Sequence, residues 1–401
     1  MIQRTLLNEI PPLLSYFPAL GLVSPRQIGK TTLVKTLSSI ITKPILYLDL
    51  ENTNDYALLE KDPQWFLEQH IDKLVVIDEV QRMLSLFPLL RVLIDQKPEG
   101  GRFILLGSAS PELLSKSSET LAGRIVYREL NPIRFDEAQK EGIDLPTHWL
   151  RGGFPKALLA PDMNLWFDWQ QSFIKTYIEI DLRMLGLKAS PIVLQKLIRM
   201  LTTVQGSTLN YSNLGNSMGI TGSTLQGYLD YLEHSFVIRR LPPYFVNVGK
   251  RLVKSPKLYF RDTGILHYLS NITDYDGLIS NIIAGHSWEG YVIEQIIGRL
   301  TGNVQAFYYR TQNGAEIDLC LMRGNEMLVS FEIKLSNNPS SSKGNTEAIQ
   351  DLQTKHNFIV TPSSKDYRIN ENWQVCSLTS LWQYLEPLKI LKQQFAVLGT
   401  K

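Results

Sequence analysis

Residues 24–32 read Ser24-Pro25-Arg26-Gln27-Ile28-Gly29-Lys30-Thr31-Thr32, and they follow directly on an apolar run at 18–23. That run has the length and composition of a buried strand, and a helix-compatible stretch at 33–40 comes next. A strand, a turn and a helix in this order are the context in which a phosphate-binding P-loop forms. The sequence therefore predicts that residues 24–32 bind the phosphates of a nucleotide.

The residue types within this loop suit that chemistry. Backbone N–H groups of the loop and of the helix N-terminus point toward one anion. Gly29 lets the backbone approach the phosphates, Lys30 reaches the β- and γ-phosphates, and the Thr31 hydroxyl binds magnesium. Ser24 stands where the motif usually has its first glycine, and serine enters positive φ less readily. The predicted ligands are ATP and Mg²⁺.

A second apolar strand, at 73–77, ends in the two acids Asp78 and Glu79. Downstream of a P-loop, Asp78 is predicted to hold Mg²⁺, directly or through water, and Glu79 to act as the general base for the attacking water. The alternative is a buried strand that ends in solvated acids. The P-loop upstream favours the catalytic interpretation.

Two further residues are candidates for the same site. Ser108 follows the strand-like segment 102–106 and is a candidate contact for the γ-phosphate, or else part of a turn. Arg124 is a candidate for stabilising transition-state charge, in its own subunit or in a neighbour, or else a solvated surface arginine. A further strand at 44–50 and the alternation of strands with helices predict an α/β fold with a doubly wound parallel sheet.

These motifs resemble a family of bacterial and archaeal AAA-type ATPases whose members carry a C-terminal domain related to restriction endonucleases. The resemblance implies this architecture, and it extends over nearly the whole chain. It rests on residues 24–33, Ile77-Asp78-Glu79-Val80-Gln81, Gly107-Ser108-Ala109, Arg151-Gly152-Gly153-Phe154-Pro155, residues 177–181 and Lys257-Leu258-Tyr259-Phe260-Arg261-Asp262-Thr263-Gly264.

The middle of the chain has the order of a winged helix-turn-helix. The expected helices lie at 192–203, 211–218 and 223–234, with a turn at 219–221 and a strand at 236–241. Bound to DNA, the helix that starts near Thr221 would enter the major groove. The candidate DNA contacts are Ser223, Thr224, Gln226, Arg239, Arg240, Lys250, Arg251 and Lys254. Because the recognition helix has no Arg or Lys, a role as a lid or protein-contact module is the alternative.

The last third contains a predicted hairpin, with strands at 315–322 and 327–335. Side chains alternate along a strand, so Glu332 and Lys334 share one face of the second strand. Asp318, on the first strand, would meet them across the hairpin.

An acid followed by acid-x-lysine is the signature of restriction-endonuclease-like folds. Asp318 and Glu332 are predicted to bind magnesium, and Lys334 to stabilise or deprotonate the attacking water. Glu289, on a predicted helix at 288–300, supplies a further acid to this metal site. Arg310, Gln312 and Lys343 are candidates to flank a nucleic-acid groove, or else they lie in loops without such a role. The alternative is an inactivated fold that binds nucleic acid without cutting it.

Composition limits the remaining choices. The chain has 401 residues, of which 44% are apolar and 20% are charged, as in soluble multidomain proteins. No apolar run in the sequence is long enough to span a bilayer, and the two cysteines predict neither a disulfide framework nor a zinc site. We therefore expect a cytoplasmic protein with no membrane partner. The net charge of +2 limits nucleic-acid contact to a local patch.

Four segments are predicted: an AAA-type ATPase at 1–150, a helical lid at 151–190, a winged helix at 191–255 and a restriction-endonuclease-like domain at 256–401. The predicted function is ATP hydrolysis coupled to nucleic-acid binding or cleavage, with DNA favoured over RNA. An AAA-type module is also compatible with a homo-oligomer. The alternative is a nucleotide-switched regulatory or scaffold protein, in which an inactive nuclease-like fold binds a protein partner.

Overall fold

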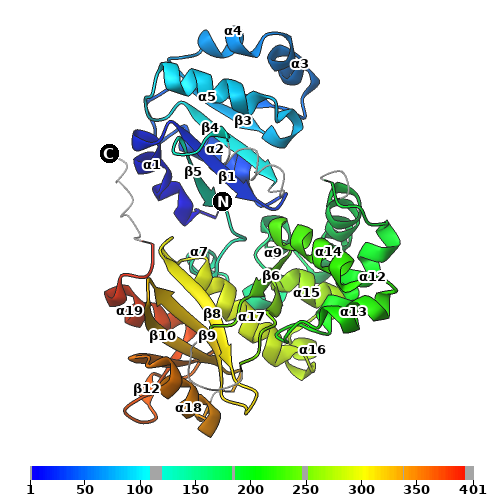
Figure 1. Ribbon diagram of the computed structural model, residues 1–401, viewed down its shortest axis with the longest axis vertical. Helices are drawn as coiled ribbons and strands as arrows, with labels where there is room; N and C mark the ends of the chain where they lie inside the picture. The colour runs from blue at the N-terminus through cyan, green and yellow to red at the C-terminus, as the bar shows by residue number, and fades with distance from the viewer. Residues whose placement is uncertain (1, 109–119, 183–185, 246–251, 337, 393–401) are drawn as a thin grey trace. The chain divides into compact units, whose positions relative to one another are not determined.

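The computed structural model describes residues 2–108, 120–182, 186–245, 252–336 and 338–392, without the side chains of 108, 179 and 180 (Figure 1). Contacts divide the chain into two units. The first consists mainly of Met1–Glu141, and the second of Gly142–Glu233 and Val237–Gln393. The division falls nine residues before the predicted boundary at 150, because α8 (Leu145–Arg151) packs within the second unit.

The first unit is built on a parallel sheet, which confirms the predicted α/β fold. Its five strands lie in the order β2-β3-β4-β1-β5. The strands are β1 (Ala19–Ser24), β2 (Ile45–Asp49), β3 (Leu74–Asp78), β4 (Phe103–Ser108) and β5 (Ile125–Glu129). β1 and β3 are buried along their whole length, as their unbroken apolar sequences require. β5 was not predicted.

Short helices surround this sheet. They are η1 (Thr5–Asn8), α1 (Ile10–Tyr16), α2 (Lys30–Leu37), α3 (Thr53–Lys61), α4 (Pro63–Glu68), η2 (Val80–Met83), α5 (Leu86–Gln96) and α7 (Phe135–Gln139). α5 buries an apolar stripe at helical spacing against the sheet, including Leu86, Leu90 and Leu93. Parallel strands place their carboxyl ends at one edge, where Ser24 pairs with Ser108 and Asp49 with Asp78. The P-loop and the acids after β3 therefore meet at one edge of the sheet.

The second unit begins with helices. They are α8, α9 (Pro155–Leu158), α10 (Met163–Phe173), the π-helix η3 (Ile174–Asp181), α12 (Pro191–Thr202), α13 (Tyr211–Met218) and α14 (Gly222–His234). The π-helix continues α10 directly. Gly219 ends α13 in the left-handed region, at φ 70°, and so forms the predicted turn.

Two antiparallel strands follow α14: β6 (Ile238–Leu241) and β7 (Lys257–Phe260). Their register pairs Ile238 with Phe260 and Leu241 with Lys257. The predicted domain boundary at 255/256 is therefore misplaced, because it separates two strands that are hydrogen-bonded to each other.

The rest of the unit surrounds a second sheet, in the order β12-β13-β11-β10-β9-β8. β8, β9 and β10 are antiparallel, and β11 and β13 run parallel to β10. Its strands are β8 (Val304–Arg310), β9 (Glu316–Arg323), β10 (Glu326–Ile333), β11 (His356–Thr361), β12 (Tyr367–Arg368) and β13 (Gln374–Ser377). The helices are α15 (Thr263–Leu269), α16 (Tyr275–Ser280), α17 (Ala284–Ile297), α18 (Lys343–Leu352), α19 (Leu378–Leu385) and η4 (Glu386–Leu388). The β9–β10 hairpin confirms the predicted strand pair.

Two of the sequence motifs meet at a buried aspartate. The Asp262 carboxylate accepts the Gly153 N–H at 2.7 Å and the Ile265 N–H at 3.1 Å. A Cβ on Gly152 would lie 2.3 Å from Asp262 Oδ1, so the loop can approach only as glycine. Burial raises the pKa of Asp262 to about 6. These contacts give the motifs at 151–155 and 257–264 a structural role, since they fasten α8 to the start of α15.

Among the described residues, no helix combines the length and the apolar character that crossing a membrane demands.

Candidate functional site

The loop between β1 and α2 has the geometry of a phosphate cradle. Gly29 adopts φ 99°, and apart from its chain neighbours nothing lies within 4 Å of the position a Cβ would take. Lys30 begins α2, and its ammonium donates to Ser24 Oγ at 3.2 Å and to Pro25 O at 3.3 Å. These acceptors are neutral, and burial lowers the pKa of Lys30. A buried ammonium held by neutral oxygens is suited to an anionic ligand. Ser24, which replaces the usual glycine, supplies one of these acceptors.

The predicted magnesium ligands lie side by side. Thr31 Oγ1 donates to Asp78 Oδ2 at 3.0 Å. Asp78 itself is buried at the end of β3. A hydroxyl and a carboxylate are the hard oxygen ligands that Mg²⁺ prefers, so the residues fit the ion that the motif implies.

Tyr47, on β2, is a third member of this group and was not predicted. Its hydroxyl donates to Asp78 Oδ2 and lies 3.4 Å from Thr31 Oγ1. Burial, together with the neighbouring Asp78 carboxylate, raises the pKa of Tyr47. The phenol is therefore a neutral donor that holds the carboxylate in place beside Thr31.

Glu79 follows β3 in a left-handed conformation, at φ 54°. This conformation is uncommon for a residue other than glycine, and such residues cluster at functional sites. Gln81 Nε2 donates to the Glu79 carboxylate, and Arg26 Nη2 lies 4.0 Å from it. Burial raises the pKa of Glu79, which brings the carboxylate closer to the basicity that a general base needs.

Ser108 and Arg124 lie at opposite ends of the parallel strands: Ser108 at the carboxyl end of β4, and Arg124 just before the amino end of β5. The Ser108 backbone pairs with Ser24 at the carboxyl ends of β4 and β1. Arg124 precedes β5, whose first residue, Ile125, pairs with Ala19 at the amino end of β1. A five-residue strand spans about 16 Å, so Arg124 cannot reach phosphates bound at the Ser24 edge of its own subunit. The proposed role in its own subunit is therefore corrected, and a role on a neighbour stays a prediction. Here Arg124 forms a bidentate pair with Asp95, at 2.5 and 2.9 Å.

Arg4 supports the P-loop from the N-terminus, and sequence reasoning missed it. Its guanidinium donates to Ile28 O at 3.1 Å and to Glu137 Oε2 at 3.1 Å. Burial opposes ionisation of Glu137, but the charges of Arg4 and Arg134 outweigh it and lower the pKa of Glu137 to about 2. One buried ion pair thus fixes the backbone of the residue before Gly29.

Arg4→Ala is expected to weaken ATP binding as well as the fold of the first unit. Removing one partner of a buried ion pair costs about 3–5 kcal/mol, because the other charge stays buried. Urea unfolding and a fluorescent-ATP titration measure the two effects. Arg91→Ala is the control, because Arg91 forms an exposed pair with Asp95 and its loss is expected to change neither. ATP affinity at the wild-type level in a destabilised Arg4→Ala protein would limit Arg4 to a structural role.

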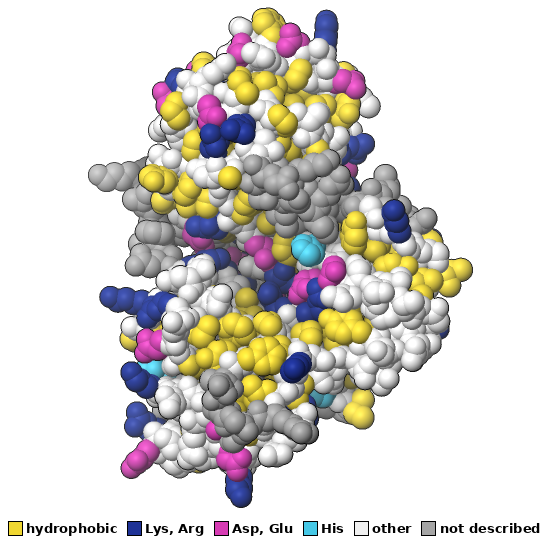
Figure 2. Space-filling model, viewed as in Figure 1, with side chains coloured by type: hydrophobic (Ala, Val, Ile, Leu, Met, Phe, Trp, Pro, Cys, Tyr) yellow, Lys and Arg dark blue, Asp and Glu magenta, His cyan; other side chains and the backbone are white. Residues whose placement is uncertain are grey.

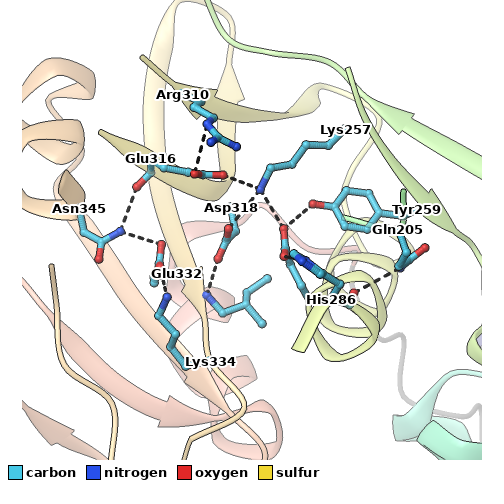
Figure 3. Close-up of polar contacts among 12 residues, drawn as sticks. Gln205, Lys257, Tyr259, His286, Arg310, Glu316, Asp318, Glu332, Lys334 and Asn345 are labelled. Carbon is cyan, nitrogen blue, oxygen red and sulfur yellow. Dashed lines mark hydrogen bonds and ion pairs between the residues drawn. The ribbon is translucent and has the colours of Figure 1, made fainter. Parts of the chain in front are cut away.

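In the second unit, acidic side chains from three elements converge (Figure 3). Glu289 comes from α17, Glu316 and Asp318 from β9, and Glu332 from β10. Asp318 Oδ2 accepts the Ile333 N–H at 2.9 Å, which links the two strands of the hairpin. The predicted neighbours are therefore neighbours in the structure.

The cation at the centre of these acids is a lysine that sequence reasoning missed. Lys257 Nζ lies 3.0 Å from Glu289 Oε1, 2.9 Å from Glu316 Oε1 and 3.3 Å from Asp318 Oδ1. Burial opposes ionisation of Glu289, but Lys257 outweighs it and lowers the pKa of Glu289 to about 2. Burial raises the pKa of Asp318, and the negative charges of Glu289 and Glu332 raise it further.

Glu332 and Lys334 form a separate pair at one side of the cluster. Lys334 Nζ lies 2.5 Å from Glu332 Oε1, and Asn345 donates to Glu332 Oε2 at 2.9 Å. Burial raises the pKa of Glu332, and Lys334 acts against this.

The predicted metal set Glu289, Asp318 and Glu332 is corrected on this geometry. Within the described part of the chain, no three His, Cys, Asp or Glu side chains are grouped so that they could hold a metal ion. The carboxylates surround the ammonium of Lys257 instead, so the residues as arranged do not fit a divalent ion.

A pocket of about 690 Å³ opens beside this cluster. Its lining includes the cations Lys257, Arg310 and Lys334 as well as the acids. Arg310 lies 3.5 Å from Glu316 and keeps 43% of its side chain exposed, and Lys334 keeps 42% exposed. Two half-exposed cations at the mouth of a pocket can meet an anionic ligand.

The basic residues predicted to contact DNA phosphates are partly engaged elsewhere. Arg239 pairs with Glu294, and Arg240 pairs with Glu233 and with Asp230, the latter at 2.6 Å. Lys254 is exposed, whereas Lys250 and Arg251 lie outside the described residues. The candidate base contacts Ser223, Thr224 and Gln226 are all exposed on α14. On the face in Figure 2, Lys and Arg are scattered among acidic and apolar side chains rather than gathered in one stripe.

Comparison with known proteins identifies the modules. Residues 16–139 match the family described as AAA domain, residues 142–276 a domain of unknown function (DUF8612) and residues 284–381 another (DUF4143). With the P-loop geometry above, the first match shows that the chain carries an AAA-type ATPase domain.

Solved structures and curated relatives extend the comparison. The Walker-type ATPase PABY2304 of Pyrococcus abyssi is 14% identical, over 67% of this chain and 96% of its own, with a TM-score of 0.47. The RuvB Holliday junction branch migration motor of Thermotoga maritima is 17% identical, over 60% of this chain and 90% of its own, with a TM-score of 0.30. The uncharacterized proteins Rv2008c of Mycobacterium tuberculosis and Mb2031c of Mycobacterium bovis are each 37% identical over 354 residues, which are 88% of this chain and 78% of theirs. The chain therefore belongs to the family of AAA-domain proteins that includes Rv2008c and Mb2031c.

Proposed function

We propose that this protein is a magnesium-dependent ATPase whose nucleotide state controls nucleic-acid binding by its second unit. The single observation that carries the ATPase part is the contact of Thr31 with Asp78 at 3.0 Å, beside the buried ammonium of Lys30. This contact supports the proposal, because nucleotide hydrolysis requires a cation for the phosphates and oxygens for Mg²⁺ close together.

Each residue then has one task in hydrolysis. Lys30 binds the β- and γ-phosphates and offsets the charge that develops on them. Thr31 and Asp78 would hold Mg²⁺, which when bound supplies a Lewis acid. Glu79 takes a proton from the attacking water. The Ser108 backbone pairs with that of Ser24, and its contact with the γ-phosphate stays a prediction.

The topology of the second unit supports nucleic-acid binding. The order α12, α13, α14, β6 and β7 is that of a winged helix-turn-helix. In the C-terminal part, α17 precedes three antiparallel strands, and α18 then connects β10 to the parallel strand β11. That order is found in restriction-endonuclease-like folds, and their acid and acid-x-lysine residues correspond to Asp318, Glu332 and Lys334. Exposed polar residues on α14 and the cations of the pocket would form the contacts, with DNA favoured over RNA.

We propose binding rather than metal-dependent cleavage as the task of the second unit. Lys257 pairs with Glu289 and Asp318, two of the acids predicted to bind metal, and its charge opposes a divalent cation there. Lys334 is tied to Glu332 and stays half-exposed, so it is available to a phosphate.

Fluorescence anisotropy with labelled duplex DNA, single strands and RNA tests the binding, in ATP and in ADP. We expect the affinity to fall with salt, with a log–log slope of about −3 to −4 for a patch that neutralises roughly four phosphates. Lys254→Ala and Lys334→Ala are each expected to reduce that slope by about one.

Lys355→Ala is the matched control, because Lys355 is 80% exposed and pairs with Glu326 away from the pocket. Absence of salt-dependent binding to every nucleic acid would rule out this part of the proposal. Cleavage in Mg²⁺ or Mn²⁺ that Lys334→Ala abolishes would replace binding by nuclease activity.

A second candidate function is that of a nucleotide-switched scaffold that binds a protein partner. The ion pairs of Arg239 and Arg240 favour it, because they remove two cations from the face that would meet phosphates. ATP-dependent capture of a defined protein, with no nucleic-acid binding, would support this candidate over the first.

A further inference from the structure

We propose that Lys257 replaces a divalent ion in the carboxylate cluster, so that this site is held together by an internal ammonium and is independent of metal. The inference concerns the architecture of the second unit, and it does not depend on whether that unit binds nucleic acid.

The coordination of the ammonium carries the argument. A protonated lysine has three N–H donors. Lys257 donates to Glu289 and Asp318 and forms an ion pair with Glu316; Figure 3 labels Lys257, Glu316 and Asp318. The three N···O distances are 2.9–3.3 Å, which is within ion-pair range. A magnesium or calcium ion would need oxygens at about 2.0–2.6 Å. Three carboxylates, carried by α17 and β9, thus share one ammonium.

Burial shows that the ammonium is part of the interior. The Lys257 side chain is 3% exposed, and that of Glu289 is 9% exposed. The Tyr259 hydroxyl donates to the same oxygen of Glu289, and the Tyr308 ring lies 5.5 Å from Lys257 Nζ. A divalent ion at the position of the ammonium would have to displace it, and the two cations would repel each other.

The backbone of Lys257 is paired on both sides, so the residue that carries the ammonium has a defined position. Leu241 pairs with Lys257 across β6 and β7, and an isolated bridge joins Thr208 to Lys257 on the other side. The neighbouring Leu258 exchanges backbone hydrogen bonds with Gly206 and Ser207, at 2.8 and 3.1 Å. The strand therefore holds the Cα of Lys257 beside the carboxylates.

Charge balance agrees with a complete site. The acids Glu289, Glu316, Asp318 and Glu332 face the cations Lys257, Arg310 and Lys334. His286 lies 3.4 Å from Glu289. The remaining negative charge is small, so the attraction for an added divalent ion is weak.

The test uses the full chain without nucleotide, in an Asp78→Asn background that removes the metal ligand of the ATPase site. With Lys257 present, we expect the same Tm in EDTA and in millimolar Mn²⁺ or Ca²⁺, and no Mn²⁺ bound by electron paramagnetic resonance. Lys257→Met is expected to lower the Tm by about 10 °C, because three carboxylates lose their counter-charge. Millimolar Mn²⁺ or Ca²⁺ is expected to restore at least half of this loss.

A second variant keeps the test decisive if Lys257→Met does not fold. Lys257→Met/Glu289→Gln has one fewer unpaired carboxylate, so it is expected to recover part of the Tm in EDTA and to respond less to Mn²⁺. The proposal is overturned if the protein with Lys257 binds Mn²⁺ in a manner that Glu289→Gln abolishes. It is also overturned if neither variant gains any stability from a divalent ion, since Lys257 would then be an ordinary buried ion-pair partner. DNA binding is measured separately, so its absence would affect only the proposed function.

Discussion

Glu79→Gln is expected to slow ATP hydrolysis by about 10²- to 10⁴-fold, the range that general-base catalysis contributes. Glutamine has the same shape but cannot accept the proton of the attacking water. Because the change keeps the volume and a hydrogen-bond acceptor for Gln81, the left-handed turn after β3 is expected to persist. ATP affinity is therefore expected to stay within a few-fold of wild type, and the variant should accumulate in the ATP-bound state. Steady-state phosphate release and a fluorescent-ATP titration separate the two quantities.

Glu51→Gln is the matched control for Glu79→Gln. Glu51 contacts the same Arg26 guanidinium, at 3.2 Å, but its side chain is 49% exposed. Its loss should change the hydrolysis rate by less than about threefold, since exposed ion pairs contribute little. Wild-type hydrolysis by Glu79→Gln would move the general base to another residue.

Lys30→Ala is expected to reduce hydrolysis by at least about 10²- to 10³-fold, which is the cost of removing one preorganised charge stabiliser from a water-excluded site. In contrast to Glu79→Gln, it should also weaken ATP binding, because the ammonium contacts the phosphates in the ground state. The Ser24 hydroxyl and the Pro25 carbonyl would lose their shared donor.

Lys35→Ala provides the comparison for Lys30→Ala, because Lys35 lies one turn further along α2 and is exposed. Its ATP affinity and its hydrolysis rate should both match wild type. A Lys30→Ala protein that binds and hydrolyses ATP normally would remove residues 24–32 from the catalytic site.

The sequence predicted those parts of the site that are formed by residues close together in the chain. Strand, loop and helix follow one another around Gly29 and Lys30, and the acids that follow β3 are consecutive, so spacing alone was informative. The β9–β10 hairpin was predictable for the same reason, since alternation along two short strands determines which side chains meet.

The rest could not be predicted because it depends on contacts between distant segments. Arg4 reaches Ile28 and Glu137 only after the N-terminal residues pack beside the sheet. Arg239 and Arg240 looked available to DNA, but the fold places acids next to them. Lys257 did leave a signal. It shares one face of β7 with Tyr259, and a lysine within an apolar strand needs a buried counter-charge.

The contacts of β7 constrain how two segments of this chain can evolve. The β7 backbone pairs with β6, whereas the side chain of its first residue, Lys257, forms ion pairs with acids on α17 and β9. The segment that follows β6 is also joined to β8, where Tyr244 N donates to Tyr308 O at 2.7 Å. The segments 142–276 and 284–381, which match two separate families, thus share one internal charge balance. A recombinant protein that received only one of these segments would contain a buried charge without its partner. We therefore expect the two segments to occur together in related proteins.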